Sequence, residues 1–390
     1  MVGELENNPD AMEELSIKLL NEGKVKEGLK LMLRAARLYE GEGRKEDAAR
    51  LFKKLGFILF EKTGSIEKAR PSLLKSAYLY IDLIEELLSA FEIDINTLDT
   101  YCLNVLEIFL ALNDEKNLVK YGSQFAAIYE DLGKSYQEAN DIKNAINAYE
   151  SAFVYYKLLD NEKYRTVAEV LVALYGDIAE KKLAEKAYGE AGEAFTRLAV
   201  YTRALFGYEA HYTEMMDTAA QNFEKASKLS YSEGDLDRTT SLLVKAEYAY
   251  LLARNFSRAK LIGVNTARML NQIVRAYRSQ GSEMDAARKL VELTETLIGI
   301  GKVTEGMQAY KKALEVTSNI ESRLRVRLAI LKWKAALDRD EALLDRIDLM
   351  EFYTRRGRSY QALELAEKTL KETEELKESL EALQLAEGIY

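Results

Sequence analysis

The segments Gly23-Lys-Val-Lys-Glu-Gly28, Gly43-Arg-Lys-Glu-Asp-Ala48 and Gly64-Ser-Ile-Glu-Lys-Ala69 share one pattern and follow one another at intervals of 20 and 21 residues. In each segment, a glycine is followed five residues later by a small residue that begins an apolar run. Glycine readily adopts the left-handed conformation that ends a helix. The small residue then lets the next helix cross closely over the one before it.

The same pattern recurs along the rest of the chain. It extends from Asn140 to Ala145, Gly234 to Thr239, Gly281 to Ala286, Gly301 to Gly306 and Gly357 to Ala362. One helix plus one turn per repeat indicates a helical solenoid. We therefore expect an all-α, right-handed superhelical solenoid of antiparallel helix hairpins, tetratricopeptide-like, with about 17 helices in a single structure over residues 1–390.

Apolar residues spaced i, i+3, i+4, i+7 mark the individual helices. The predicted ranges are 11–21, 25–40, 45–61, 66–90, 97–112, 115–137, 141–159, 163–182, 186–205, 209–232, 237–252, 256–279, 283–299, 303–318, 321–337, 340–356 and 359–387. Pro71 lies inside the range 66–90, where we keep the helix and expect a local irregularity. The range 359–387 is acidic with an apolar stripe, and we expect it to cap the last repeat.

Composition agrees with a continuous series of helices. The chain has only 2 prolines in 390 residues, 48% hydrophobic residues and 31% charged residues. Its single cysteine, Cys102, cannot form an internal disulfide, and no run reaches the roughly 18 apolar residues of a membrane span. The acidic start of the chain does not resemble a signal peptide. We expect a cytoplasmic protein. Its net charge of −9 argues against nucleic acid as the main partner.

The residues that catalysis would require are scarce. His211 is the only histidine. Its His-x-x-Glu spacing to Glu214 could place two metal ligands on one helix face, but a solvated or capping histidine is the favoured interpretation. Cys102 is interpreted as a small buried hydrophobic residue. Gly133-Lys-Ser135 lacks the earlier glycine and the strand of a phosphate-binding loop. We predict no enzymatic activity, no metal and no cofactor.

Charge is unevenly distributed. Between Tyr248 and Ser282 there is no Asp or Glu, and the stretch carries six basic residues, namely Arg254, Arg258, Lys260, Arg268, Arg275 and Arg278. Arg268, Arg275 and Arg278 are spaced by seven and three residues and share a helix face. Such a basic stretch would suit an acidic helical partner or phosphate groups. The alternative is that acidic faces of neighbouring repeats neutralise it.

A family resemblance rests on two groups of residues. Ala127-Ile-Tyr129 and the run Asp141-Ile-Lys-Asn-Ala-Ile-Asn-Ala-Tyr-Glu-Ser-Ala-Phe-Val-Tyr-Tyr156 resemble the central region of the soluble NSF-attachment proteins of the alpha-SNAP type. Leu33-Arg-Ala-Ala-Arg-Leu-Tyr39 resembles their N-terminal hairpins. The similarity covers about residues 25–205. By this resemblance we divide the chain into a SNAP-like region over 1–318 and a C-terminal helical extension with a capping helix over 319–390.

The resemblance implies a function. Members of that family lie along a four-helix SNARE bundle through basic residues and recruit a hexameric AAA+ ATPase in membrane trafficking. Lys120, nine residues before Tyr129, falls at one of the family's basic positions. We therefore expect an adaptor that binds an acidic helical bundle or coiled coil through Lys120, Arg254, Arg258, Arg268, Arg275 and Arg278, with at most peripheral membrane contact.

Two other functions stay open. The first is a tetratricopeptide-like scaffold that holds an extended peptide, which requires a concave groove with Asn and Lys side chains. The second, an enzyme, is disfavoured because no credible active site is present. The sequence also leaves open whether the C-terminal repeats extend the surface of the earlier ones or fold back over it.

Overall fold

The computed structural model describes residues 8–90, 93–208, 210–373, 376, 378 and 381. Within these residues the chain forms seventeen helices and no strand, so the predicted all-α helical solenoid is confirmed. The chain divides into two compact units, residues 1–167 and 168–390. The boundary falls inside one helix, and the expectation of a single solenoid over residues 1–390 stays a prediction.

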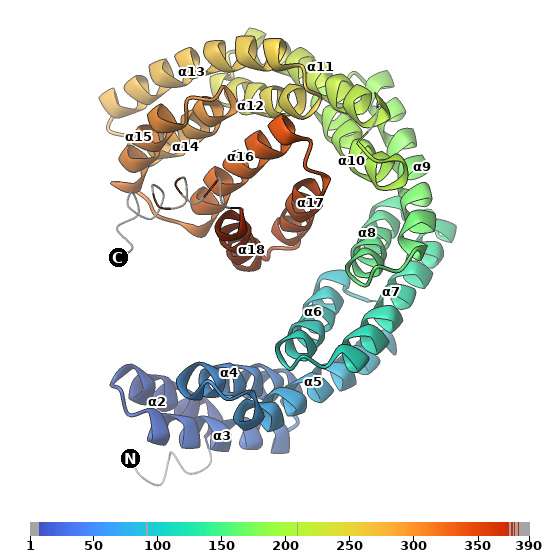
Figure 1. The fold of residues 1–390 in the computed structure, drawn as a ribbon, viewed down its shortest axis with the longest axis vertical. Helices are drawn as coiled ribbons and strands as arrows, with labels where there is room; N and C mark the ends of the chain where they lie inside the picture. Colours follow the sequence, from blue (N-terminus) through green and yellow to red (C-terminus); the bar gives the residue numbers. More distant parts are fainter. Residues whose placement is uncertain are drawn as a thin grey trace. The chain divides into compact units, whose positions relative to one another are not determined.

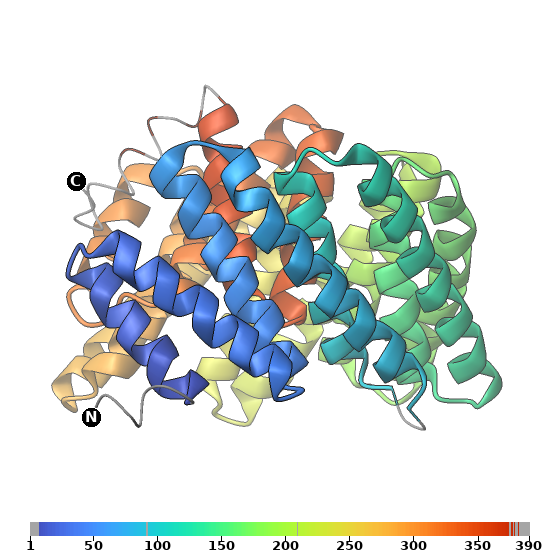
Figure 2. The same ribbon diagram turned by 90° about the horizontal axis from the view of Figure 1, so that it is seen from below.

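Unit 1 consists of helices that pack against their neighbours in sequence. They are α2 (Pro9–Asn21), α3 (Val25–Gly41), α4 (Lys45–Thr63), α5 (Ile66–Leu88), α6 (Ile95–Ala111), α7 (Glu115–Glu138), α8 (Ile142–Leu158) and the start of α9 (Lys163–Ala184). Figure 2 shows the blue and teal helices of this unit side by side in an antiparallel arrangement. Helix α5 continues through Pro71 as one element, which confirms the predicted helix, and its helical assignment is unbroken there, without the local irregularity that we expected.

Unit 2 continues the series from the remainder of α9. Its helices are α10 (Tyr188–Phe206), α11 (Ala210–Ser232), α12 (Leu236–Leu252), α13 (Phe256–Ser279), α14 (Glu283–Gly299), α15 (Val303–Leu314), α16 (Ile320–Asp338), α17 (Glu341–Arg355) and α18 (Ser359–Glu372). The predicted single helix over 359–387 is wrong, because α18 ends at Glu372 and Thr373 is extended; most of the remaining predicted range lies outside the described residues.

The C-terminal helices of unit 2 fold back against its earlier ones. Helix α16 packs on both α12 and α14, and α17 and α18 pack on α16. In Figure 1, α11 and α13 lie on the outer side of the arc that unit 2 forms, and α16–α18 lie inside it. The C-terminal repeats therefore cover the inner face of unit 2, which settles the alternative that the sequence left open.

The turns have the conformation that the repeated pattern predicts. All eight of the residues that begin the pattern have a positive φ, from 60° at Asn140 to 81° at Gly301. The small residue five positions later is buried in every case. After the turn at Asn140, the Asp141 side chain accepts a hydrogen bond from the Asn144 amide and begins α8. Each repeat therefore contains its own stop signal and its own close helix crossing.

Candidate functional site

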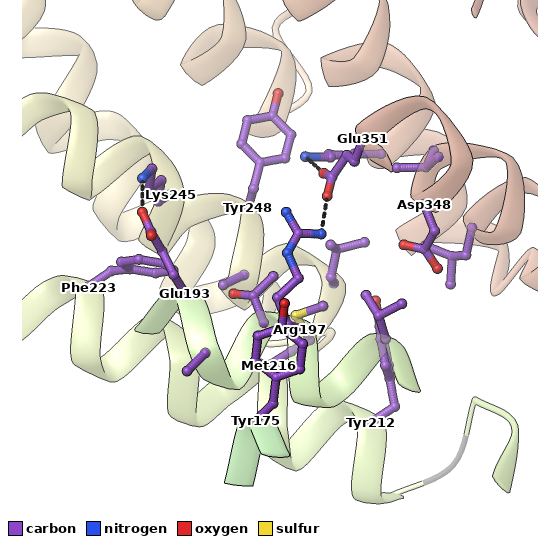
Figure 3. Close-up of a pocket in the computed structure, with 18 of the residues that line it drawn as sticks. Tyr175, Glu193, Arg197, Tyr212, Met216, Phe223, Lys245, Tyr248, Asp348 and Glu351 are labelled. Atoms are coloured by element: carbon purple, nitrogen blue, oxygen red, sulfur yellow. Dashed lines mark hydrogen bonds and ion pairs between the residues drawn. The ribbon is translucent and has the colours of Figure 1, made fainter. Parts of the chain in front are cut away.

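A cavity of about 580 Å³ lies on the inner face of unit 2, between α9–α12 and the C-terminal helices α16 and α17. We call it the inner cavity. Figure 3 shows the aromatic side chains of Tyr175, Tyr212, Phe223 and Tyr248 around it. Aliphatic side chains complete the wall: Ile178, Val200, Met216, Leu252, Leu344 and Ile347. A concave, largely apolar site with a few charged groups is the usual form of a ligand or peptide site.

Helix α10 contacts α17 across this cavity through oppositely charged side chains. Arg197 Nη1 lies 3.2 Å from Glu351 Oε2, and Lys332 Nζ of α16 lies 2.7 Å from Glu351 Oε1. Figure 3 shows the ion pair between Arg197 and Glu351 as a dashed line. Burial raises the pKa of Glu351. The positive charges of Lys332 and Arg197 lower it by a larger amount, so the pKa lies well below its ordinary value.

A second contact joins the same helices about two turns along α10. Arg203 is 4% exposed. Its Nη2 lies 2.8 Å from Asp345 Oδ1 and 2.5 Å from Asp348 Oδ2. Burial lowers the pKa of Arg203, but Asp348 and Asp345 outweigh burial and raise it, so the guanidinium stays charged. We call Arg197, Arg203, Asp345, Asp348 and Glu351 the α10–α17 cluster.

The backbone at the start of α17 adds to this contact. The Tyr208 amide donates to Glu341 Oε1 at 2.9 Å, and Arg203 Nη1 donates to the Glu341 carbonyl oxygen at 3.4 Å. Acidic residues at the N-terminus of a helix are favoured by the positive end of its dipole. Together with the α10–α17 cluster, the Glu341 contacts attach α17 to α10 and to the segment that follows it along most of the length of α17.

Other charged residues at the inner cavity are paired with one another. Lys182 Nζ lies 2.7 Å from Glu190 Oε2, and Lys245 Nζ lies 2.6 Å from Glu193 Oε1. Among the described residues, the lining contains no His, Cys or Ser. The lining can therefore bind a ligand by apolar contact and charge, and these residues present no Ser-His or Cys-His nucleophile pair.

The basic residues that the sequence predicts as a binding site come from both units and differ in their local environment. Lys120 is exposed on α7 of unit 1, with its ammonium 4.5 Å from the centre of the Tyr121 ring. Arg254 lies in the turn before α13 with a left-handed φ of 61°, and its guanidinium is 5.5 Å from the Phe256 ring centre. Arg254 thus takes the turn position that glycine holds in other repeats.

The remaining four arginines lie on α13 but differ in environment. Arg258 Nη2 is 2.5 Å from Glu224 Oε1 of α11, so neutralisation by a neighbouring repeat holds at this position. Arg278 lies 3.6 Å from Glu283. Arg268 and Arg275 are exposed, and neither has an ion pair among the residues that the structure describes. Arg268 and Arg275 are therefore the two predicted arginines of α13 that have no ion pair among the described residues.

Exposed apolar residues continue the line of Arg268 and Arg275 along α13. Leu261 is 52% exposed and Val264 is 40% exposed. With Arg268 and Arg275 they are spaced by three, four and seven residues, which places all four on one helix face. We call these four residues the α13 stripe. Sequence reasoning identified its arginines from charge but did not identify its apolar half.

A smaller groove of about 400 Å³ lies over α4, α5 and α6 in unit 1. Arg50, Lys53 and Lys54 of α4 line one side of this groove, and Thr100 and Asn104 of α6 line the other. Lys53 Nζ donates to Asn104 Oδ1 at 2.8 Å. This unit 1 groove contains the Lys and Asn side chains that a peptide-binding scaffold requires.

The other sequence candidates take ordinary positions. His211 is exposed and makes an edge contact with Phe206. Cys102 is buried, as predicted. Gly133 lies inside α7, a helical context that excludes a phosphate-binding loop. Among the described residues no group of three or more His, Cys, Asp or Glu could hold a metal ion. None of the described helices is long and apolar enough to cross a membrane.

Sequence reasoning missed the α10–α17 cluster. The signal was present as an acidic face, because Asp345, Asp348 and Glu351 follow one another at intervals of three residues. The basic partners lie about 150 residues earlier in the chain; Arg197 and Glu351, for example, are 154 positions apart. No local pattern connects two positions at that separation.

No family model and no curated protein matches the chain. Among solved structures it is similar to a circular tandem repeat protein with a novel repeat topology, with a TM-score of 0.27, 16% identity and coverage of 98% of this chain and 96% of the other. It is similar to the TPR domain of P58(IPK), with a TM-score of 0.18, 17% identity and coverage of 97% and 98%. For yeast Tom70 the TM-score is 0.17, with 14% identity and coverage of 97% and 95%. At these TM-scores the similarities carry no argument about activity or partners.

Proposed function

We propose that this chain is a non-catalytic adaptor that binds an acidic helical partner along the α13 stripe. The observation that carries the proposal is the pair of exposed arginines, Arg268 and Arg275, each without an ion-pair partner in the described part of the chain. No acidic residue lies between Tyr248 and Ser282 to compete for them. Leu261 and Val264 supply apolar contacts on the same face.

The chemistry of the stripe defines the partner. An amphipathic helix with two apolar residues followed by carboxylates along one face matches Leu261, Val264, Arg268 and Arg275 in order. Guanidinium groups bind carboxylates in a two-pronged geometry, which favours a helix with fixed carboxylate positions over a diffuse negative charge. In its finer form the proposal names a SNARE-like bundle as partner and an AAA+ ATPase as second partner. The resemblance of Ala127–Tyr156 to the SNAP family supports that form.

A defined probe tests the coarser form. We would titrate the full-length chain with a soluble four-helix coiled-coil bundle whose surface is rich in Glu, and measure affinity at several salt concentrations. Binding should weaken as salt rises, because exposed charges supply much of the attraction. The Arg268→Glu/Arg275→Glu variant should lose most of the affinity. Equal affinity of this variant and the wild type would refute the proposal.

A matched control separates a specific contact from general charge. Lys311 and Lys312 are exposed on α15 and make no ion pair among the described residues. Lys311→Glu/Lys312→Glu therefore changes the net charge by the same amount at another surface. This control should keep the wild-type affinity. For the finer form, a SNARE-type bundle and an AAA+ ATPase should both be retained by the wild type and lost with Arg268→Glu/Arg275→Glu.

The unit 1 groove favours a second candidate function, the binding of an extended acidic peptide. Lys53 and Asn104, which are hydrogen-bonded to each other, can turn to peptide carbonyl and amide groups, and Lys54 adds positive charge at the rim, whereas Arg50 is paired with Glu13. A labelled acidic peptide should bind the wild type and bind the Lys54→Glu/Asn104→Asp variant several-fold more weakly. Lys30→Glu, an exposed residue outside the groove, is the control. Equal binding by all three proteins would exclude this groove.

A further inference from the structure

We propose that the inner face of α10 is a docking site for acidic amphipathic helices, and that α17 of the same chain occupies this site. The surface is different from the α13 stripe and does not depend on it. A partner helix with the same arrangement of carboxylates would bind by displacing α17. Helix α17 is thus a built-in competitor as well as part of the fold.

The pattern of α17 shows what this site accepts. Glu341, Asp345, Asp348 and Glu351 are spaced by four, three and three residues, so their carboxylates lie along one helix face. All four contact α10, its C-terminal segment or Lys332. Leu344 and Ile347 lie beside them and line the inner cavity. An acidic row with two adjacent apolar residues is therefore the occupant that the site already holds.

The charges on the opposite side are suited to such an occupant. Arg203 is 4% exposed, and the carboxylates of Asp345 and Asp348 are its ion-pair partners. A guanidinium buried to this degree requires paired anions, because an uncompensated buried charge is strongly unfavourable. A partner helix that covers Arg203 in the same way must therefore supply carboxylates at the positions of Asp345 and Asp348. Arg197 and Lys332 likewise require a carboxylate at the position of Glu351.

The inner cavity explains how a partner could compete. Helix α17 reaches α10 through charged groups, whereas the apolar side chains of Val200, Met216 and Leu344 border a space of about 580 Å³. A partner helix with bulkier apolar residues at the positions of Leu344 and Ile347 would fill that space. It would bury more apolar surface than α17 does, and apolar burial is the main source of affinity in such grooves.

The packing of α17 allows it to move without unfolding unit 2. Helix α17 packs on α16 and α18, and α16 packs separately on α12 and α14. A rotation of α17 and α18 on α16 would break the α10–α17 cluster and leave the α12–α14–α16 packing in place. Because α17 is tethered, it competes at a local concentration in the millimolar range. The closed chain should therefore bind a free acidic helix weakly.

The experiment uses the full-length chain and a peptide of its own sequence. The probe is a fluorescently labelled peptide of residues 340–356, and its binding is followed by anisotropy. The Asp345→Lys/Asp348→Lys variant places positive charge against Arg203 and should release α17. It should bind the peptide at least about tenfold more tightly than the wild type, because the tethered competitor has been removed. A peptide carrying Leu344→Phe should bind more tightly still.

Hydrogen exchange reports whether the variant opens or unfolds. In Asp345→Lys/Asp348→Lys, the amides of α17 should exchange faster while those of α12 and α16 remain protected. Adding Arg203→Glu to the variant restores opposite charges across the contact, so protection of α17 should return and peptide binding should fall. If α16 also loses protection, the milder Asp345→Ala/Asp348→Ala variant, which changes only α17 and leaves the α10 site intact, is measured with the same two readouts.

Two controls fix the interpretation. Glu315→Lys/Glu364→Lys makes the same change of net charge at exposed positions outside the α10–α17 cluster, and should leave peptide affinity unchanged. Arg268→Glu/Arg275→Glu in the opened variant should also leave it unchanged, which separates this site from the proposed function. The inference is overturned if α17 protection is the same in the opened variant and the wild type. It is equally overturned if α17 opens and peptide affinity does not rise.

Discussion

The carboxyl group of Glu247 lies so close to the backbone of α14 at Gly299 that a Cβ atom on Gly299 would come within 2.3 Å of Glu247 Oε1. Gly263 of α13 borders the same carboxyl group, at 2.7 Å for its own Cβ position. Glu247 is fully buried, and neither of its oxygens has a hydrogen-bond partner among the described residues. Helices α12, α13 and α14 therefore meet around a carboxyl group that fits only because two glycines face it.

The protonation of Glu247 predicts an unusual dependence of stability on pH. Burial, with a further contribution from the charge of Glu295, raises the pKa of Glu247 well above the ordinary 4.5, and Thr296 offsets this only in part. The native state keeps the proton that the unfolded state releases above pH 4.5. The contribution of Glu247 to the free energy of unfolding therefore falls as pH rises from 4.5 towards the native pKa of Glu247. The decrease is up to about 1.4 kcal/mol per pH unit.

The measurement compares the wild type with Glu247→Gln by urea denaturation between pH 5 and pH 8. Other titrating groups are common to both proteins and cancel in the difference. The variant should gain stability relative to the wild type as pH rises. A difference that stays flat over this range would show that Glu247 does not retain its proton in the native state.

The contact between Glu247 and Gly299 predicts coupled effects of substitution. Gly299→Ala should lower the free energy of unfolding by about 1–3 kcal/mol, because the added methyl group overlaps a buried side chain. In a Glu247→Ala background the same substitution should cost much less, since the overlapping oxygen is gone. The double-mutant cycle measures this coupling.

Gly176 supplies the control for that cycle. It lies inside α9, and a Cβ there would meet no atom within 4 Å. Gly176→Ala should stabilise the chain by about 0.5–1 kcal/mol, the usual gain from replacing a glycine within a helix. If the changes in the free energy of unfolding caused by Glu247→Ala and Gly299→Ala were additive in the double variant, the close contact between the two residues would be contradicted.

The fold could be predicted from the sequence as far as it depends on residues close together in the chain. A glycine that ends one helix and a small residue that starts the next crossing are both read within six positions, and the turn and the crossing form where they occur. Arg254 shows the limit of the pattern. It adopts the left-handed turn conformation and is followed five residues later by the buried Ala259, so the repeat is present without the glycine that would reveal it.

The candidate site depended on contacts between distant residues, which the sequence could not supply. Charge counting identified Arg258 and Arg268 together, although only the spatial position of Glu224 distinguishes a neutralised arginine from an exposed one. The α10–α17 cluster could not be predicted, because it forms only when α16–α18 fold back on the inner face of unit 2. A local acidic face on α17 looks the same whether solvent or α10 covers it.

The small residues of the repeated pattern predict a third effect on stability. Ala145 is fully buried where α8 crosses the preceding helix. Ala145→Leu should lower the free energy of unfolding by about 1–3 kcal/mol through overpacking. Ala276 is exposed on α13, and Ala276→Leu should change stability by less than about 0.5 kcal/mol. Thermal and urea denaturation of both variants would check this. Equal changes in stability for the two variants would show that the helix crossing at Ala145 does not require a small residue.

Glu351 predicts a pH effect of the opposite sign to that of Glu247. Its pKa is held well below 4.5 by Lys332 and Arg197, despite burial. The stabilisation is therefore complete above pH 4.5 and is lost as pH falls towards the native pKa. Glu351→Gln should lower the free energy of unfolding by about 1–3 kcal/mol at pH 7, because it leaves two cations with a neutral partner. The cost of the substitution should shrink as the buffer is acidified below pH 4.5, since the unfolded wild type then takes up a proton that the native carboxylate does not, which lowers the stability of the wild type. Urea denaturation at neutral and acid pH provides the two values, and a cost that does not depend on pH would mean that the ion pairs of Glu351 contribute nothing to holding α17 against α10.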